Sequence, residues 1–302
     1  MYFIGRSTNA SVTVLQKYNI PEPVTGGGIA SLAALLVFLV AGVEIIYDLS
    51  ARDTLLIYFF TAIGINARVR DLLAGGRPLL ILLCLTLGYI VIQNLVGVSA
   101  AQLMGHPTAV GVITGSASLI GGHGTAIAWA PEIADKHGIE NALELGVASA
   151  TLGLVLASLM GGPIAQHLVA RYGLSGAHEE PPLVGLSYKD EATEQINHVS
   201  ILAVMLALHV AIIIGYLVHQ LIGAAGVMLP RFVPCLLVAI VLSNTLPIVA
   251  PRVRWPARTR ALAVVSDLSL GLFIAMSLMG MQLWGLADLA GPLLVMLGLQ
   301  LV

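Results

Sequence analysis

One stretch of the chain combines glycines with hydroxyl side chains and a histidine: Thr114, Ser116, Ser118, Gly121, Gly122, His123, Gly124 and Thr125. Glycine lets the backbone approach a ligand closely and adopt positive φ. Where such a run opens a helix, the first amide N–H groups lack intrahelical partners and favour a carboxylate. Hydroxyl and carbonyl oxygens suit a hard cation such as sodium. The stretch therefore predicts a site for a small anion beside sodium, and a packing motif of small residues is the alternative.

His123 leaves three roles open: a hydrogen bond to substrate, a proton relay, or a bond to a neighbouring carbonyl group. An intramembrane hydrolase would need a nucleophile held by this histidine. The sequence shows no serine–histidine–acid arrangement and no histidine or cysteine spacing typical of a metal site. We therefore predict no catalytic residue, no metal site and no enzymatic activity.

Further polar side chains stand at the ends of apolar runs, where a ligand role and a solvated cap are equally good interpretations. Asp267 opens the run 267–280, and Asp53 opens the run 54–65. Arg52, beside Asp53, can meet a substrate carboxylate, although an ion pair with its neighbour is the simpler interpretation. Asn94 and Asn244 lie within apolar runs, where such residues more often join helices than bind ligands.

The composition determines which elements can carry these residues. Of the 302 residues, 58% are hydrophobic and 10% are charged, and the mean hydropathy is +0.94. Soluble domains carry about 25% charged residues, so this chain needs lipid as its solvent. The net charge of −2 provides no basic face for nucleic acid. We predict an all-α polytopic membrane protein.

Eight apolar runs predict the membrane helices: 24–43, 54–65, 78–104, 142–170, 198–223, 228–250, 261–280 and 291–302. The polar stretch 171–197 is the long connection between them. It predicts a cytoplasmic linker between a first half, 1–170, and a second half, 198–302.

The segment 108–130 is apolar enough to enter a membrane, yet its centre is a poor helix former. The positive-inside rule places two arginine clusters in the cytoplasm. Both lie there only if 108–130 enters and leaves the membrane on the same side. We therefore predict a re-entrant hairpin from the outside, which persists only where it lines a cavity or is buried in protein. The clusters are Arg68, Arg70 and Arg77, and Arg252, Arg254, Arg258 and Arg260.

The two halves resemble each other in opposite orientation. Residues 59–80 echo 275–294, and aligning Gly64 with Gly280 gives an offset of 216 that pairs Asn66 with Gln282 and Asp53 with Ser269. The loop 281–290 lacks the arginines of its counterpart, whereas 251–260 is basic where 44–53 is mostly acidic. Inverted repeats of this kind are typical of secondary transporters.

The same offset predicts a second hairpin near residue 339, beyond Val302. No apolar run precedes 24–43 to match 198–223. We therefore expect a form of the protein that is truncated at both ends.

Several stretches carry a resemblance to a known family: KYNIPEPVTGG, SARDTLLIYFFTAIGINA, GSASLIGGHGTAIAW, LASLMGGP and SLMGMQLW. In this order and spacing, the chain resembles the bacterial sodium:glutamate symporters over nearly its whole length. The resemblance implies ten membrane spans, two re-entrant hairpins, a homodimer in the bacterial inner membrane, and an elevator-type movement coupled to sodium. It also implies that glutamate binds at the hairpin tips.

The sequence thus predicts sodium-coupled glutamate symport by an inverted-repeat secondary transporter with a re-entrant hairpin. A carrier of another small di- or tricarboxylate and a non-transporting remnant are the alternatives. The residues assigned to the substrate are Arg52, Ser118, Gly121, Gly122, His123, Gly124 and Thr125. Those assigned to the co-transported sodium are Asn66, Ser116, Asp267 and Ser269.

Overall fold

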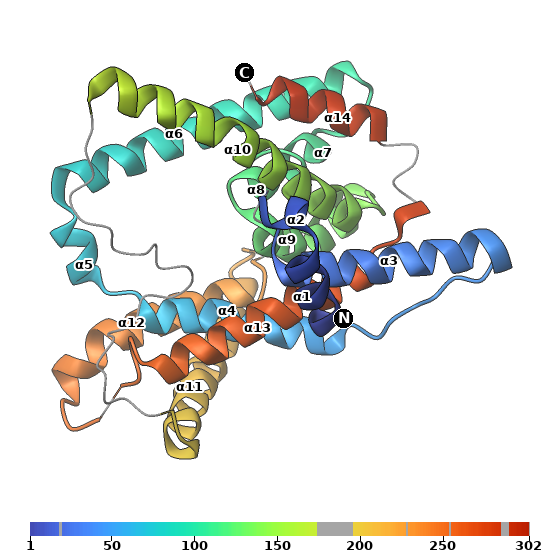
Figure 1. Ribbon diagram of the computed structural model, residues 1–302. Coiled ribbons are helices and arrows are strands. Elements are labelled where there is room, and N and C mark those ends of the chain that lie inside the picture. Colours follow the sequence, from blue (N-terminus) through green and yellow to red (C-terminus); the bar gives the residue numbers. More distant parts are fainter. Residues whose placement is uncertain (18–19, 174–195, 228, 254, 285–289, 302) are drawn as a thin grey trace. The chain divides into compact units, whose positions relative to one another are not determined.

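The computed structural model describes residues 1–302 except 18–19, 174–195, 228, 254, 285–289 and 302. The described residues form α-helices and connecting segments, with no strand among them (Figure 1). The helices are α1 (Tyr2–Ser11), α2 (Thr13–Lys17), α3 (Glu22–Ala41), α4 (Ser50–Asn66), α5 (Val69–Ala74), α6 (Gly76–Leu103), α7 (Thr108–Ile113), α8 (Ser116–Leu119), α9 (Gly122–His137), α10 (Ala142–Tyr172), α11 (His198–Ala224), α12 (Phe232–Val249), α13 (Arg260–Met279) and α14 (Ala290–Leu299).

Each of the eight predicted runs carries a helix. Within the described parts of the chain, five helices are long and apolar enough to cross a membrane, namely α3, α6, α11, α12 and α13. Helix α6 is the clearest case, because only 6% of its most apolar 18-residue window is buried inside the protein. Exposed leucines of this kind are stable only against lipid or another apolar surface. The predicted class is confirmed, and the chain is an all-α, multi-pass membrane protein.

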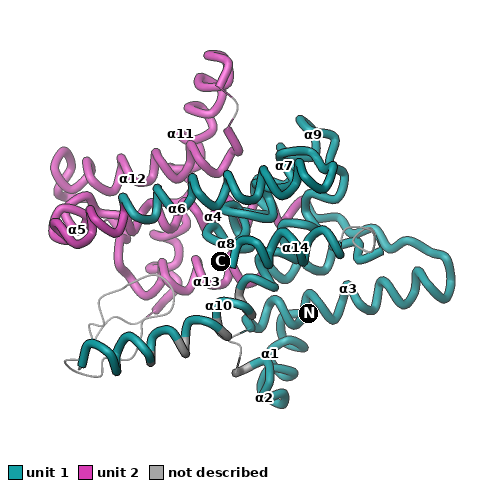
Figure 2. The backbone as a smooth tube through the Cα atoms, turned by 90° about the horizontal axis from the view of Figure 1, so that it is seen from above, with its two compact units in different colours: residues 1–49, 84–181, 274–302 teal, residues 50–83, 182–273 magenta. Residues whose placement is uncertain are grey.

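The chain forms two compact units (Figure 2). Unit 1 comprises residues 1–49, 84–181 and 274–302, and unit 2 comprises residues 50–83 and 182–273. Each unit combines residues from both halves of the sequence. The predicted linker 171–197 falls largely on 174–195, outside the described residues, and the inverted halves stay a prediction.

In unit 1, α7, α8 and α9 pack against α10, and α14 also contacts α10. A Cβ atom on Gly97 of α6 would lie 2.4 Å from the carbonyl oxygen of Gly111 of α7. Only glycine permits this close approach of two backbones. Small and branched side chains from five helices and the α9–α10 connection form the buried core around it: Ala100, Ala101, Ala109, Val110, Ile113, Ala126, Ala130, Ile133, Ile139, Ala142, Leu145, Leu293, Met296 and Leu297.

In unit 2, α4 packs along α12, and both contact α11. Gly64 makes the close approach possible, because a Cβ atom there would lie 2.5 Å from the carbonyl oxygen of Leu236. One turn earlier, the rings of Phe60 and Phe232 lie 4.2 Å apart between centroids. The C-terminal end of α4 is thereby held against α12, and Asn66 is the last residue of that helix.

Candidate functional site

The helical segment of unit 1 that carries the glycine-rich run is interrupted twice. Helix α7 ends before Thr114 and Gly115, the short α8 follows, and α9 begins at Gly122. Gly122 has a φ of +71°, which strains any residue with a side chain. At Gly121, a Cβ atom would lie 2.5 Å from the carbonyl oxygen of Ala117. The second break therefore requires glycine at both positions.

Hydroxyl side chains bridge the first break. Ser118 donates a hydrogen bond to the carbonyl oxygen of Ile113, the last residue of α7. Ser116 donates to Oδ1 of Asn94 on α6 at 2.6 Å. Asn94 thus joins two helices, as the sequence predicts for a polar residue in an apolar run. Both serines have a protein partner, and that of Ser118 is a backbone carbonyl group.

His123 is buried, and its Nε2 atom lies 2.9 Å from the hydroxyl oxygen of Thr151 on α10. That hydroxyl group donates its own proton to the carbonyl oxygen of Val147 at 2.9 Å. Thr151 must therefore accept, and Nε2 of His123 must carry the hydrogen. His123 thus bonds to a neighbouring hydroxyl group, where the third interpretation expected a carbonyl group, and this bond ties α9 to α10.

The glycines of the run and Thr125 are more accessible than His123 and Ser118. Gly121 is exposed, and Gly122, Gly124 and Thr125 are half-buried. A cavity of about 550 Å³ lies beside them, and its lining is mostly apolar. Ser116, Gly121, Thr125 and Trp129 are among its lining residues. The structure therefore gathers three of the predicted ligands at one cavity, which is large enough for a small amino acid.

The other predicted ligands belong to unit 2. Arg52 forms an ion pair with its neighbour Asp53 at 2.8 Å, which is the simpler of its two interpretations. Ser269 is buried and donates to the carbonyl oxygen of Val265 in its own helix at 2.7 Å. Asp267, on α13, is exposed. Of the two residues here with side-chain oxygens that are assigned to sodium, Asp267 is therefore more accessible than Ser269.

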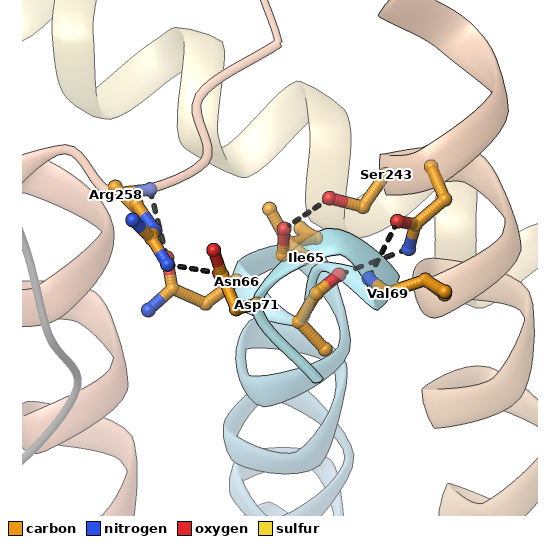
Figure 3. Close-up of polar contacts among 8 residues, drawn as sticks. Ile65, Asn66, Val69, Asp71, Ser243 and Arg258 are labelled. Atoms are coloured by element: carbon orange, nitrogen blue, oxygen red, sulfur yellow. Dashed lines mark hydrogen bonds and ion pairs between the residues drawn. The ribbon is translucent and has the colours of Figure 1, made fainter. Parts of the chain in front are cut away.

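Asn66 takes part in a polar joint at the C-terminal end of α4 (Figure 3). Its Oδ1 atom accepts a hydrogen bond from the backbone N–H of Arg258 at 2.8 Å. The guanidinium group of Arg258 forms an ion pair with Asp71, and Ser243 donates to the carbonyl oxygen of Ile65 (Figure 3). A helix end leaves carbonyl groups without intrahelical donors, and here side chains from α12 provide them.

Asn244 completes this joint with three hydrogen bonds. Its Nδ2 atom donates to the carbonyl oxygens of Ala67 at 3.0 Å and Ile240 at 2.8 Å. Its Oδ1 atom accepts from the backbone N–H of Val69 at 2.9 Å. The predicted role of Asn244 in joining helices is confirmed.

The sequence analysis did not single out three buried polar residues of unit 1. Gln93 and Gln300 are 4% and 8% exposed, and Glu144 is 6% exposed. Glu144 accepts a hydrogen bond from the backbone N–H of Gln282 at 3.2 Å. Gln93 carries a signal that could have found it, since it stands beside Asn94 within an apolar run. No comparable pattern marks Glu144 among the polar residues near helix ends.

The sequence profile of the sodium/glutamate symporter family matches residues 1–302. The chain belongs to the sodium/glutamate symporter family. The sodium/glutamate symporter of Escherichia coli (strain K12) is 38% identical over 300 residues, covering 99% of this chain and 74% of the relative. The sodium/glutamate symporter of Haemophilus influenzae is 33% identical over 303 residues, covering 99% of this chain and 73% of the relative. No solved structure matches the chain.

This membership confirms the resemblance drawn from the sequence stretches. The sodium/glutamate symporter family is one of transporters, and the chain is therefore not an enzyme. In a membrane transporter, an interrupted helix beside a cavity is the usual place for substrate and coupling-ion sites. The segment α7–α9 has both features.

Proposed function

We propose that this chain carries glutamate across the membrane together with sodium ions. The observation that carries the proposal is the family match over residues 1–302, joined by relatives that are named sodium/glutamate symporters. The interrupted segment α7–α9 supports it, because the helix breaks beside a cavity.

The substrate site in this proposal lies at the start of α9. Gly121 and Thr125 line the cavity, with Gly122 and Gly124 between them in the chain, and the first amide groups of a sixteen-residue helix attract a carboxylate. Ser118 Oγ and His123 Nε2 would have to give up existing hydrogen bonds to donate to a substrate carboxylate. We therefore assign these two residues to holding the segment in shape. Arg52 is proposed as a partner of the substrate only in a state where its pair with Asp53 opens.

The proposed sodium ligands are considered for each unit by itself: an oxygen atom of Ser116 in unit 1, and oxygen atoms of Asn66, Asp267 and Ser269 in unit 2. Asp267 is the strongest of these candidates, because a carboxylate on a membrane-crossing helix is costly unless it has a function. An amide oxygen has two acceptor sites, so Asn66 can accept from Arg258 and still bind an ion. Sodium binding near α8 would order the segment and raise glutamate affinity by linkage.

The topology and movement belong to the proposal as well. We propose that 108–130 is a re-entrant hairpin, that the halves 1–170 and 198–302 are inverted repeats, and that transport is an elevator-type movement of a homodimer. The bacterial relatives favour the cytoplasmic membrane as the location. Cysteine labelling at positions 116 and 130, with Cys84 and Cys235 replaced, tests the hairpin. Labelling from the same side supports it, and labelling from opposite sides contradicts it.

Uptake of labelled glutamate into proteoliposomes tests the function. We expect uptake driven by an inward sodium gradient and no uptake with choline in place of sodium. Excess aspartate and citrate serve as competitors, since helix N-termini favour carboxylates in general. Stronger competition by citrate than by unlabelled glutamate would favour a di- or tricarboxylate carrier. Absence of sodium-driven uptake of any of these would contradict the proposal.

A further inference from the structure

The two arginine clusters of the sequence belong to the same compact unit. The first cluster follows α4 and the second follows α12, and the described residues of both clusters are part of unit 2. Hydrogen bonds between residues 175 apart in the chain, such as that of Val69 with Asn244, join the segments that carry them. We therefore asked whether the clusters form one surface.

The connection from α4 to α5 is fixed against α12 on both sides of Arg68. Asn244 of α12 donates to the carbonyl oxygen of Ala67 at 3.0 Å and accepts from the backbone N–H of Val69 at 2.9 Å. Arg68, between these two residues, is exposed and begins α5 as its N-cap. The backbone that carries Arg68 therefore lies beside α12, the helix that Arg252 follows.

Arg258 joins the second cluster to the first. Its guanidinium group forms an ion pair with Asp71 of α5, and its backbone N–H donates to Oδ1 of Asn66 at 2.8 Å (Figure 3). Arg70, the neighbour of Asp71 in the chain, is exposed. The two clusters thus meet at the ends of α4 and α12. We call Arg68, Arg70, Arg252 and Arg258 the basic surface.

The basic surface carries an excess of positive charge, although the whole chain has a net charge of −2. The segments 67–77 and 250–260 contain one acidic residue in their sequence, Asp71, which is paired with Arg258. Among the described contacts, Arg68, Arg70 and Arg252 have no ion-pair partner. A guanidinium group binds a phosphate group through two parallel hydrogen bonds. The surface is therefore suited to phosphate.

The position of the basic surface indicates which phosphate it meets. Helix α12 is apolar enough to cross a membrane and ends three residues before Arg252. Next to Arg70, α5 exposes the apolar side chains of Leu72 and Leu73, which are 57% and 75% accessible. Arginines beside exposed leucines at a helix end are typical of the membrane–water interface, where leucine enters the acyl region and arginine reaches the headgroups. This favours a lipid over a soluble polyanion.

We propose that the basic surface binds the headgroups of phospholipids with net negative charge, through the exposed guanidinium groups of Arg68, Arg70 and Arg252. Lipid bound to both turns holds the ends of α4 and α12 together and stabilises unit 2. The inference goes beyond the proposed function, since this binding requires neither glutamate nor sodium.

The test titrates the purified full chain, in a neutral detergent, with phosphatidylglycerol or phosphatidylcholine and follows the melting temperature. Phosphatidylglycerol should stabilise the protein at lower concentration. Arg68→Gln, Arg70→Gln and Arg252→Gln should each raise its concentration at half-maximal stabilisation by about fivefold, the effect of one arginine near an anionic membrane surface, and together by about a hundredfold. The midpoint for phosphatidylcholine should stay unchanged in every variant.

Arg231→Gln is the matched control. Arg231 is an exposed arginine at the opposite end of α12, so its loss removes the same charge without touching the basic surface. It should leave the phosphatidylglycerol midpoint unchanged. Lysine in place of Arg68, Arg70 and Arg252 keeps the charge and should keep most of the affinity.

Three results would overturn the inference. The first is a wild-type phosphatidylglycerol midpoint in the triple glutamine variant. The second is an equal shift in the Arg231→Gln control, and the third is an equal shift of the phosphatidylcholine midpoint. Each would show that the preference for anionic lipid does not come from these three arginines.

Discussion

Two polar regions of the molecule differ in how completely their hydrogen bonds are matched. At the end of α4 in unit 2, Asn66, Ser243 and Asn244 bond to backbone groups and Arg258 pairs with Asp71 (Figure 3). Nε of Arg258 is the buried atom there without a partner among the described residues. In the interrupted segment of unit 1 and its surroundings, the backbone breaks twice, and the buried amide oxygens of two glutamines have no described partner. Polar groups that satisfy one another hold a membrane protein together, whereas an interrupted helix beside a cavity is the usual place for a ligand.

The largest effect expected from this contrast comes from the second break. Gly122→Val should abolish sodium-dependent glutamate binding and leave membrane insertion intact. The reason is that valine cannot keep a φ of +71° without strain, so the start of α9 changes shape. Equilibrium binding of labelled glutamate in membranes measures the loss.

The matched control is Gly226→Val. Gly226 also has positive φ, at +84°, and a Cβ atom would meet nothing within 4 Å at either glycine. The control should therefore suffer similar local strain in unit 2 without loss of glutamate binding. Wild-type binding by Gly122→Val would remove α9 from the site.

Asp267 sharpens the contrast, because it is a polar residue of unit 2 outside the joint. Its carboxylate is exposed on α13, and it has no hydrogen-bond or ion-pair partner among the described contacts. If unpaired oxygens mark ion sites, Asp267→Asn should raise the sodium concentration needed for half-maximal uptake by about tenfold, the order expected for loss of a ligand charge. Asp71→Asn, which removes the carboxylate paired with Arg258, is the control and should leave that concentration unchanged. Equal sodium dependence in both variants would contradict the distinction.

Asn244→Leu should destabilise the polar joint at the end of α4 without changing glutamate transport. The substitution removes three hydrogen bonds and leaves backbone groups of the α4–α5 connection, α5 and α12 without their side-chain partner. We expect unfolding to become easier by about 1–2 kcal/mol, the usual scale for such bonds in membrane proteins. Thermal melting in detergent measures the loss, and the glutamate KM of the surviving protein should stay at the wild-type value. A large rise in KM would show that the joint also serves the site.

The smallest effect is expected at the bond between His123 and Thr151. Thr151→Val removes the acceptor of Nε2–H at nearly constant volume. Since one hydrogen bond contributes about 1 kcal/mol, glutamate affinity should fall by a factor of about three to ten as α9 loosens from α10. Thr151→Ser keeps the hydroxyl group and should restore the affinity. Failure of the serine variant to restore it would mean that the methyl group, and not the hydrogen bond, matters.

Several features of the fold were predictable from short stretches of sequence. The eight apolar runs carry helices, because hydropathy and length are properties of consecutive residues. The glycines at 121 and 122 indicated an interrupted helix, since backbone freedom is a property of the residue itself. The pair Arg52–Asp53 was equally visible, as its members are neighbours in the chain.

The partners of the polar groups were not predictable in this way. His123 finds Thr151, Asn66 finds Arg258, and Asn244 finds Val69, each across a long stretch of chain. Such pairings depend on which helices pack together and on how far each helix is shifted along its axis relative to its neighbour. The two compact units, each built from both halves of the sequence, show how little of this follows the order of the chain.

The sequence by itself determined the membrane class, the helices in the eight apolar runs, the break at Gly121 and Gly122, and the family. These follow from local hydropathy, local backbone freedom and stretches of matching residues. Only the tertiary structure decided which polar groups are satisfied and which are left over. The reason is that a hydrogen bond between distant residues exists only after packing has brought donor and acceptor within about 3 Å of each other.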